Sequence, residues 1–223
     1  MRKYPLVTGS IYHLMSKSIA GYQIFNQPAD YQYLIRALRY FSLRTQPSKF
    51  SYFLKRDPRV QKEGFEAAVQ GLAEEEGSTV QVIAYCIMPT HVHVVTKQLD
   101  TDKISSFMNK TLNTYTRYFN IKHNRLGPLW AGRFKNVPVK TTEQLLHVVR
   151  YIHLNPTSAA LTATPEKWPY SSYREYISPQ TSDYPLTHTA DLFEMTPEQH
   201  KTFTEDQQDY QRELAIIKHQ ILE

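Results

Sequence analysis

This chain of 223 residues has a single cysteine, no long apolar run, and no internal repeat or low-complexity segment. The lone Cys86 excludes an internal disulfide and any zinc cluster built from several cysteines. No apolar run approaches the length of a membrane span, and the opening MRKYPLVTGS has no apolar stretch after its basic residues. We therefore expect neither a signal peptide nor a transmembrane helix, and a reducing, cytoplasmic setting fits the cysteine usage best.

Acidic residues are missing from one long segment. The whole chain carries a formal charge of +5, but between Lys103 and Lys140 there are eight Lys or Arg residues and no Asp or Glu. Aromatic residues are interleaved with these cations: Tyr115, Tyr118, Phe119, Trp130 and Phe134. Such a mixture can hold a phosphate backbone and stack on bases, which predicts a polyanionic partner. The alternative is a solvated helix face combined with core aromatics.

The hydrophobic content of 41% is enough for one sizeable folded domain. Strands are expected at 10–19, on both sides of the MPT turn in 78–97, and around RFKNVPVK; helices are expected at 28–43, 102–123 and 141–156. Thr141 or Thr142 can cap the last helix, and Pro156 is expected to end it. The first six elements have the ferredoxin-like order β-α-β-β-α-β, which predicts an α+β fold with a four-stranded antiparallel sheet and two helices on one face.

Two segments lie outside this pattern. Residues 44–78 are rich in Pro and Gly and end in AEEEG, so we interpret them as an insertion with one short helix around GFEAAVQGLA. Beyond a domain spanning 1–178, residues 179–223 are expected to form a C-terminal extension that ends in a helix.

The stretch MPTHVHVV raises a chemical question, because it places two histidines in an apolar strand. Residues two apart on a strand point to the same side, so His91 and His93 should present their imidazoles together. Apolar neighbours favour neutral rings, which can ligate a divalent cation. The alternative is a pair of ordinary surface or core histidines.

A second constellation lies in the helix expected at 141–156. Its apolar stripe is Leu145, Val148, Val149 and Ile152, whereas His147, Tyr151 and Asn155 recur every four residues on another face. A phenol can act as a nucleophile, and a carboxamide oxygen one turn later can ligate Mg²⁺ or Mn²⁺. An ordinary half-buried tyrosine near a helix end is the alternative.

Together these motifs resemble the REP-associated tyrosine transposases, members of the single-tyrosine superfamily that carries a His-hydrophobe-His (HUH) motif. The resemblance covers most of residues 10–176 outside 44–78 and is carried by IYHLMSKSI, AYCIMPTHVHVV, YTRYFNIKHNRLGPLWAGRFK, VVRYIHLNP and WPYSSYREY. It implies a ferredoxin-like domain with its catalytic helix after the fourth strand. It also implies cleavage and rejoining of single-stranded DNA beside a hairpin, with a divalent metal and a 5′-phosphotyrosine intermediate.

By position, the resemblance assigns the metal-binding histidines to His91 and His93 and the nucleophile to Tyr151. It assigns the third metal ligand to Asn155, where insertion-sequence relatives usually have Gln. Tyr115 and Tyr118 are rival nucleophiles, although they fall in a segment that the resemblance associates with structural and DNA-facing roles. The residues expected to bind DNA are Lys110, Arg117, Arg125, Arg133 and Lys135.

The sequence thus predicts a transposase-like endonuclease and strand transferase that uses Mg²⁺ or Mn²⁺ on single-stranded or hairpin DNA. A monomer or a homodimer is expected, with no membrane partner. One alternative is a domesticated nucleic-acid-binding protein that keeps the fold but does not cut. Another is a small-molecule metallohydrolase, which would need a further ligand or general base that the sequence does not identify.

Overall fold

A four-stranded antiparallel sheet forms the centre of the computed structural model, which describes residues 4–179, 183–188, 194–209 and 211. The strands are β1 (Ile11–Lys17), β2 (Val80–Met88), β3 (His91–Gln98) and β4 (Lys135–Val139). Their spatial order is β2-β3-β1-β4, with β1 and β3 in the middle. This is the ferredoxin-like arrangement that the sequence predicts, and the expected strands are confirmed.

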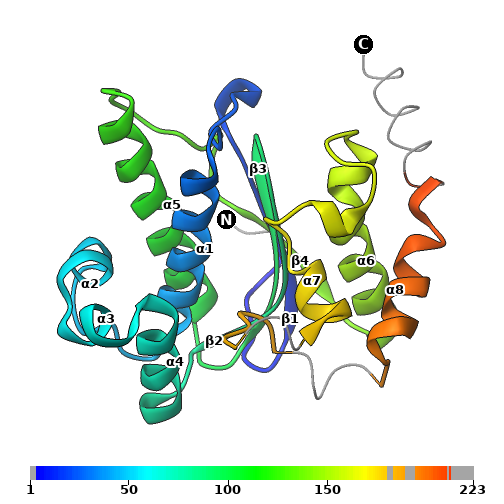
Figure 1. Cartoon of the computed structure of the whole chain (residues 1–223), viewed down its shortest axis with the longest axis horizontal. Helices are drawn as coiled ribbons and strands as arrows, with labels where there is room; N and C mark the ends of the chain where they lie inside the picture. Colours follow the sequence, from blue (N-terminus) through cyan, green and yellow to red (C-terminus); the bar gives the residue numbers. More distant parts are fainter. Residues whose placement is uncertain (1–3, 180–182, 189–193, 210, 212–223) are drawn as a thin grey trace.

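Two long helices cover one face of the sheet. They are α1 (Pro28–Ser42) and α5 (Lys103–Lys122), and they lie side by side in Figure 1. α1 begins where Gln27 and Asp30 form reciprocal capping bonds, with Pro28 at the first helical position. Alternate strand residues, among them Leu14, Val92 and Val94, pack beneath the two helices in the main hydrophobic core.

The opposite face of the sheet carries α6 (Thr142–Ser158) and the short α7 (Tyr173–Ile177), with α8 (Pro197–Glu205) packed outside them (Figure 1). A second buried cluster joins α6 to the sheet: Ile83, Ala84, Cys86, Met88, Val95, Leu145, Val149, Ile152 and Tyr176. Short 3-10 turns occur at Ile19–Gly21 and Pro165–Lys167. The sheet therefore has one face for the α1–α5 pair and another for the helix that carries Tyr151.

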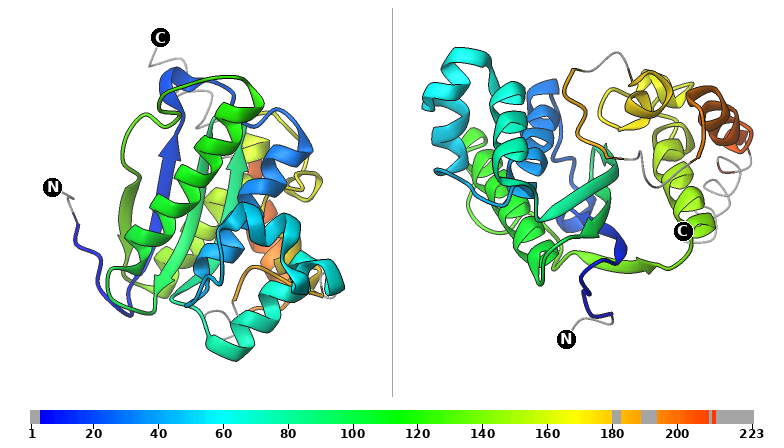
Figure 2. Two further views of the ribbon diagram at one scale, coloured as in Figure 1. Left: turned by 90° about the vertical axis from the view of Figure 1, so that its left-hand side faces the viewer. Right: turned by 90° about the horizontal axis from the view of Figure 1, so that it is seen from below.

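The segment 44–78 contains three helices, whereas its sequence predicts one. They are α2 (Phe50–Arg56), α3 (Pro58–Glu63) and α4 (Phe65–Glu76). Figure 2 shows them, in cyan, packed beside α1. Phe50, Phe53, Phe65 and Leu72 form a third buried cluster with Tyr40 of α1. The expected helix is α4; α2 and α3 were missed because helices of six or seven residues show too little periodicity.

The prediction that Pro156 ends the helix expected at 141–156 is wrong, since α6 continues to Ser158. The proline removes only its own backbone N–H, and the final turn still closes through the bond from Ala159 N to Asn155 O, 3.0 Å long.

The helix that the sequence predicts at the end of the C-terminal extension, over 197–221, is present as α8 up to Glu205. A turn at Asp206 and Gln207 interrupts it, and residues 210 and 212–223 lie outside the described part of the chain. No helix among the described residues is both long and apolar enough to cross a membrane.

Candidate active site

The two histidines of β3 point towards α6. Val92 and Val94 pack beneath α1 and α5, whereas Val95 belongs to the cluster beneath α6. His91 and His93 alternate with the first two valines and therefore share the α6 face, with ring centroids 5.0 Å apart and planes at 83°. The expectation that they present their rings together is confirmed by this geometry.

Each of these rings has one nitrogen already engaged. The Nδ1 atom of His91 lies 2.9 Å from the Thr90 hydroxyl oxygen. The Nδ1 atom of His93 lies 2.9 Å from Nε2 of His13, a residue of the neighbouring strand β1. Within the described part of the chain, neither Nε2 atom of the β3 pair has a hydrogen-bond partner. A neutral ring that donates from Nδ1 keeps its Nε2 lone pair for a metal.

The surroundings keep these rings neutral at pH 7. Burial, with a smaller contribution from the positive charge of Lys17, lowers the pKa of His91 to about 4. Burial also lowers the pKa of His13 to about 4. The pKa of His93 falls well below its usual value, mainly through burial and further through the neighbouring His13 and His91. Neutral imidazole is the form that binds metals.

α6 places Tyr151 beside the two histidines of β3. Thr141 is the N-cap of the helix, and its hydroxyl accepts a hydrogen bond from Gln144 N at 3.1 Å. Val149 and Ile152 are fully buried against the sheet, and this fixes the rotation of the helix about its axis. The Tyr151 ring then lies 5.9 Å from the His93 ring, edge to face at 88°.

Tyr151 lies against the histidines but stays accessible. Its side chain is 41% exposed, so a large substrate can reach the phenol. Partial burial, with a minor contribution from Cys86, raises the pKa of Tyr151 above its usual value. The hydroxyl is therefore protonated at neutral pH and must lose its proton when it attacks.

Asn155 lies one helical turn after Tyr151. Its side chain is partly buried, and its Nδ2 atom is buried with no hydrogen-bond partner among the described residues. The two ends of a carboxamide can exchange places by rotation, so this side chain has an unsatisfied polar end that a ligand can occupy.

In the described ranges, no three His, Cys, Asp or Glu side chains are arranged to hold a metal ion. A metal would therefore need His91 and His93 plus oxygen donors from Asn155, solvent or substrate. Cys86 does not fill that role, because burial raises the pKa of its thiol and keeps it protonated. The residues present fit a divalent cation with several open positions for oxygen ligands.

The rival nucleophiles lie on the other side of the sheet. Tyr115 is fully buried on the sheet-facing side of α5, and its hydroxyl donates to the backbone carbonyl of Ile24. The Tyr118 hydroxyl donates to the Asp30 carboxylate at 2.8 Å. Both phenols have elevated pKa values, chiefly because they are buried. We conclude that Tyr115 and Tyr118 stabilise the α1–α5 layer.

The expected DNA-binding residues are divided between distant parts of the surface. Lys135 is paired with Met15, which is paired with His93, so all three side chains share one face. Arg133 is exposed just before that strand, and Arg125 donates to backbone carbonyls of its own loop.

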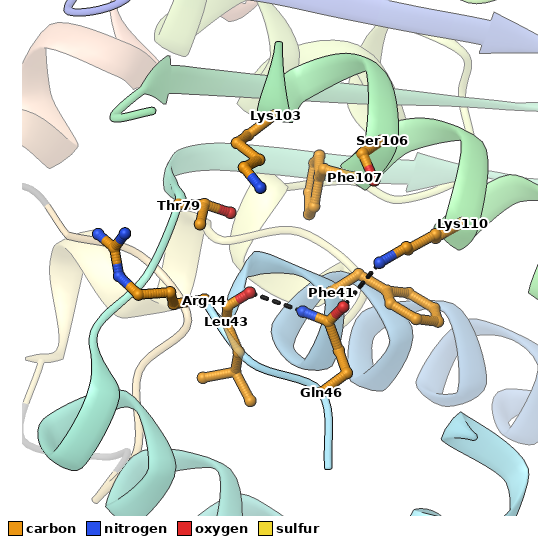
Figure 3. Close-up of a pocket in the computed structure, with 9 residues that line it drawn as sticks. All are labelled: Phe41, Leu43, Arg44, Gln46, Thr79, Lys103, Ser106, Phe107 and Lys110. Atoms are coloured by element: carbon orange, nitrogen blue, oxygen red, sulfur yellow. Dashed lines mark hydrogen bonds between the residues drawn. The ribbon is translucent and has the colours of Figure 1, made fainter. Parts of the chain in front are cut away.

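Lys110 and Arg117 are exposed on α5, which covers the opposite face of the sheet. Figure 3 shows Lys110 in a small pocket at the end of α1, where its ammonium donates to Gln46 at 2.7 Å. These two residues are therefore not brought together with the histidine pair.

The aromatics of the basic segment are not free to stack on DNA. Tyr115, Phe119, Trp130 and Phe134 are all buried, so the stacking role expected for them is wrong. A different aromatic, Tyr22, is 65% exposed.

Tyr22 borders a pocket of about 290 Å³ that also involves Gln23, Ile24, Phe119, His123, Arg125 and Leu129. Ile24 N donates to Pro89 O at 2.9 Å, which places this pocket next to the turn that precedes His91.

His13 and Lys17 lie near the histidine pair, although the sequence patterns above do not single them out. Both are in IYHLMSKSI, four residues apart on one strand and hence on one face. Lys17 is exposed and paired with His91, so it adds a cation beside the histidine pair. The same alternation that singled out His91 and His93 could have grouped His13 and Lys17.

Three comparisons relate this geometry to known proteins. A family model described as "Transposase IS200 like" matches residues 55–155, a range that contains His91, His93, Tyr151 and Asn155. A Haemophilus influenzae protein named for the REP-associated tyrosine transposases is 23% identical over 107 residues. That match covers 44% of this chain and 61% of the relative, so it spans less than two thirds of the relative's length.

The third comparison is with a solved structure, described as a REP-associated tyrosine transposase bound to a REP hairpin. It matches with a TM-score of 0.54 and 17% identity, over 88% of this chain and 94% of that chain. At that identity the likeness establishes the fold. The comparisons thus agree with the resemblance: over part of its sequence this chain is similar to the IS200-like and REP-associated tyrosine transposases, and it shares the fold of the solved REP-associated tyrosine transposase.

Proposed function

We propose that this protein is a metal-dependent endonuclease and strand transferase that acts on single-stranded DNA beside a hairpin, with Tyr151 as its nucleophile. The observation that carries the proposal is the convergence of α6 and β3. Tyr151 lies 5.9 Å from the ring of His93, and both β3 histidines have their Nδ1 atoms engaged and their Nε2 atoms available. An exposed phenol beside two neutral imidazoles suits covalent attack on a phosphodiester.

His91, His93 and Asn155 would hold Mg²⁺ or Mn²⁺. Such a cation supplies Lewis-acid polarisation of the scissile phosphate and offsets the negative charge that develops on its oxygens. The ring nitrogens favour Mn²⁺ over Mg²⁺ as a probe, because imidazole is a softer ligand than water or a carboxylate.

The phenolic oxygen of Tyr151 attacks phosphorus, and the bond from phosphorus to the 3′ oxygen breaks. The phenol proton leaves as the new bond forms, since the pKa of Tyr151 is raised and little phenolate exists beforehand. The departing 3′ oxygen takes a proton from solvent, so the products are a 5′-phosphotyrosine and a free 3′-hydroxyl. Because the phosphodiester's energy is conserved in the covalent bond, a 3′-hydroxyl can later attack and rejoin the strand without ATP.

Two features near Tyr151 fit a nucleic-acid strand. Lys17 and Lys135 are exposed on the histidine face of the sheet, where their ammonium groups can contact phosphates on either side of the cleaved bond. The pocket beside Tyr22 is large enough for one unpaired base, and it lies next to the turn before His91. A duplex keeps its bases stacked, so this pocket favours single strands.

The test is covalent capture. The full chain is incubated with hairpin-bearing single-stranded DNA and Mn²⁺, and the products are separated under denaturing conditions. A 3′ label should migrate with the protein and a 5′ label should not, because the tyrosine retains the 5′ phosphate of the downstream fragment. Chelation by EDTA should abolish the adduct. If the protein binds the hairpin and neither label becomes attached, a non-cleaving DNA-binding protein is the better interpretation.

A further inference from the structure

His13 contacts both the candidate ligand and the candidate nucleophile. It lies on β1 and is 8% exposed. Its ring stacks on that of His93, with centroids 5.1 Å apart and planes at 25°, and it lies 6.4 Å from the Tyr151 ring. The contact between Nε2 of His13 and Nδ1 of His93 is 2.9 Å long, the length of a good hydrogen bond.

A neutral imidazole carries a single proton, so this contact has two forms. In one, His93 donates from Nδ1 to His13, and Nε2 of His93 keeps its lone pair. In the other, His13 donates, and the proton of His93 must sit on Nε2, where it blocks a metal. Only the first form, in which His93 donates, lets His93 bind a metal through Nε2. In that form the single proton of His13 must be on Nδ1, because its Nε2 accepts.

We propose that His13 is a positioning residue that accepts the Nδ1 proton of His93, and so fixes the ring and the tautomer in which His93 binds a divalent cation. The proposal rests on the metal-dependent function proposed above. The Thr90 hydroxyl lies 2.9 Å from Nδ1 of His91, and it serves His91 in the same way in the tautomer where that Nδ1 donates. Both candidate ligands thus have a side-chain partner that can hold the Nδ1 proton and leave Nε2 for the cation. A histidine in this role is unusual, because carboxylates, backbone carbonyls and waters are the common partners.

The cross-strand geometry explains why the contact is built into the fold. His13 is paired with Val95, and Met15 is paired with His93, so the two imidazoles are diagonal neighbours on adjacent strands. Diagonal positions are within reach of long side chains. Burial of His13 in the sheet leaves its ring little freedom to turn away from His93.

The first measurement is Mn²⁺ affinity of the full, DNA-free chain by calorimetry. His13→Phe keeps an aromatic ring and removes the acceptor; it should weaken Mn²⁺ binding by about 10- to 100-fold. His13→Gln keeps an acceptor oxygen and should recover most of the affinity. His147→Phe is the matched control, since His147 is an exposed histidine of α6 whose ring nitrogens contact Arg150 and Glu143. This control should bind Mn²⁺ like the parent.

The second measurement needs no substitution, so it holds even if the His13 variants fail to fold. Long-range ¹H–¹⁵N correlations of the parent loaded with diamagnetic Zn²⁺ identify which nitrogen of His13 carries the proton. The proposal expects the proton on Nδ1 and an unprotonated Nε2. A proton on Nε2 of His13, or parental Mn²⁺ affinity in a folded His13→Phe protein, overturns it.

These outcomes separate the positioning role from the proposed function. If the parent binds Mn²⁺ and forms the DNA adduct while His13→Phe binds equally well, only the role of His13 fails. If the parent binds no Mn²⁺ at all, both the metal-dependent function and the role of His13 fail.

Discussion

Acidification should barely weaken metal binding above about pH 5.5. Protons compete with a metal for Nε2 only near the pKa of the ligand histidine. For two ordinary histidines with a pKa of about 6.5, roughly one in ten rings is neutral at pH 5.5, so both are neutral in about one molecule in a hundred. Mn²⁺ affinity would then fall about 100-fold between pH 7.5 and 5.5.

The structure predicts a different result. Burial lowers the pKa of His91 to about 4, so at pH 5.5 about 97% of His91 rings remain neutral. The pKa of His93 is also lowered well below its usual value by burial, so the neutral ring is favoured there too. The sign follows from the depressed pKa: the neutral, metal-binding form persists as the pH falls and is lost only as it approaches 4. Mn²⁺ affinity at pH 5.5 should be within about twofold of that at pH 7.5.

Calorimetric titration of the DNA-free chain with Mn²⁺ at pH 7.5, 6.5 and 5.5 tests this, with circular dichroism to verify that the fold persists. A drop near 100-fold in a folded protein would show that the two histidines titrate like exposed ones. That result would contradict the claim that burial in β3 keeps the two imidazoles neutral and therefore able to bind a metal.

Three further predictions concern DNA binding and stability. Tyr22→Ala should weaken binding of hairpin DNA with a single-stranded flank by about 5- to 100-fold, the loss of one stacked base, whereas Tyr52→Ala, an exposed tyrosine of α2, should bind like the parent in fluorescence anisotropy. Lys17→Ala should lower the slope of log affinity against log salt by about one, and Lys110→Ala should leave it unchanged. Burial lowers the pKa of His200 to about 4, so the folded protein keeps this ring neutral while the unfolded chain becomes protonated below pH 6.5. The stability that this difference contributes, on the order of 3 kcal/mol, is present above pH 6.5 and is lost as the pH falls to 4. Urea unfolding should therefore show a smaller loss of stability between pH 6.5 and 4.5 in His200→Gln than in the parent, and an unchanged loss would contradict this.

Most of the fold could be predicted because local patterns and tertiary packing agree. The alternation around Val92 and Val94 matches a strand that is buried on both faces, and α1 has its proline and capping residues at its first turn. The helices α2 and α3 could not be predicted in this way. They meet at Asp57, which ends one and caps the other. Phe50 and Phe53 of α2 pack in the cluster with Tyr40 of α1, whereas α3 has no buried residue and only its partly buried Val60 packs against that cluster.

The parts of the candidate site that lie within a single strand or helix could be predicted from residue spacing. Spacing within β3 placed His91 beside His93, and spacing within α6 placed Asn155 one turn after Tyr151. The contact of His13 with His93 depends on the register between β1 and β3, which no pattern within a single strand reveals. Burial of Phe119 and Trp130 likewise follows from the packing of α5, although their sequence context suggested a DNA-facing role.

The most direct test of the central claim is the covalent adduct formed by Tyr151→Phe. This change removes one oxygen that has no hydrogen-bond partner among the described residues and leaves the ring against His93, so folding and hairpin binding should match the parent. The adduct and strand cleavage should both be lost. Tyr118→Phe is the matched control; it should still form the adduct, because its hydroxyl bonds to Asp30 on the other side of the sheet. Adduct formation by Tyr151→Phe at the parental rate would contradict the account.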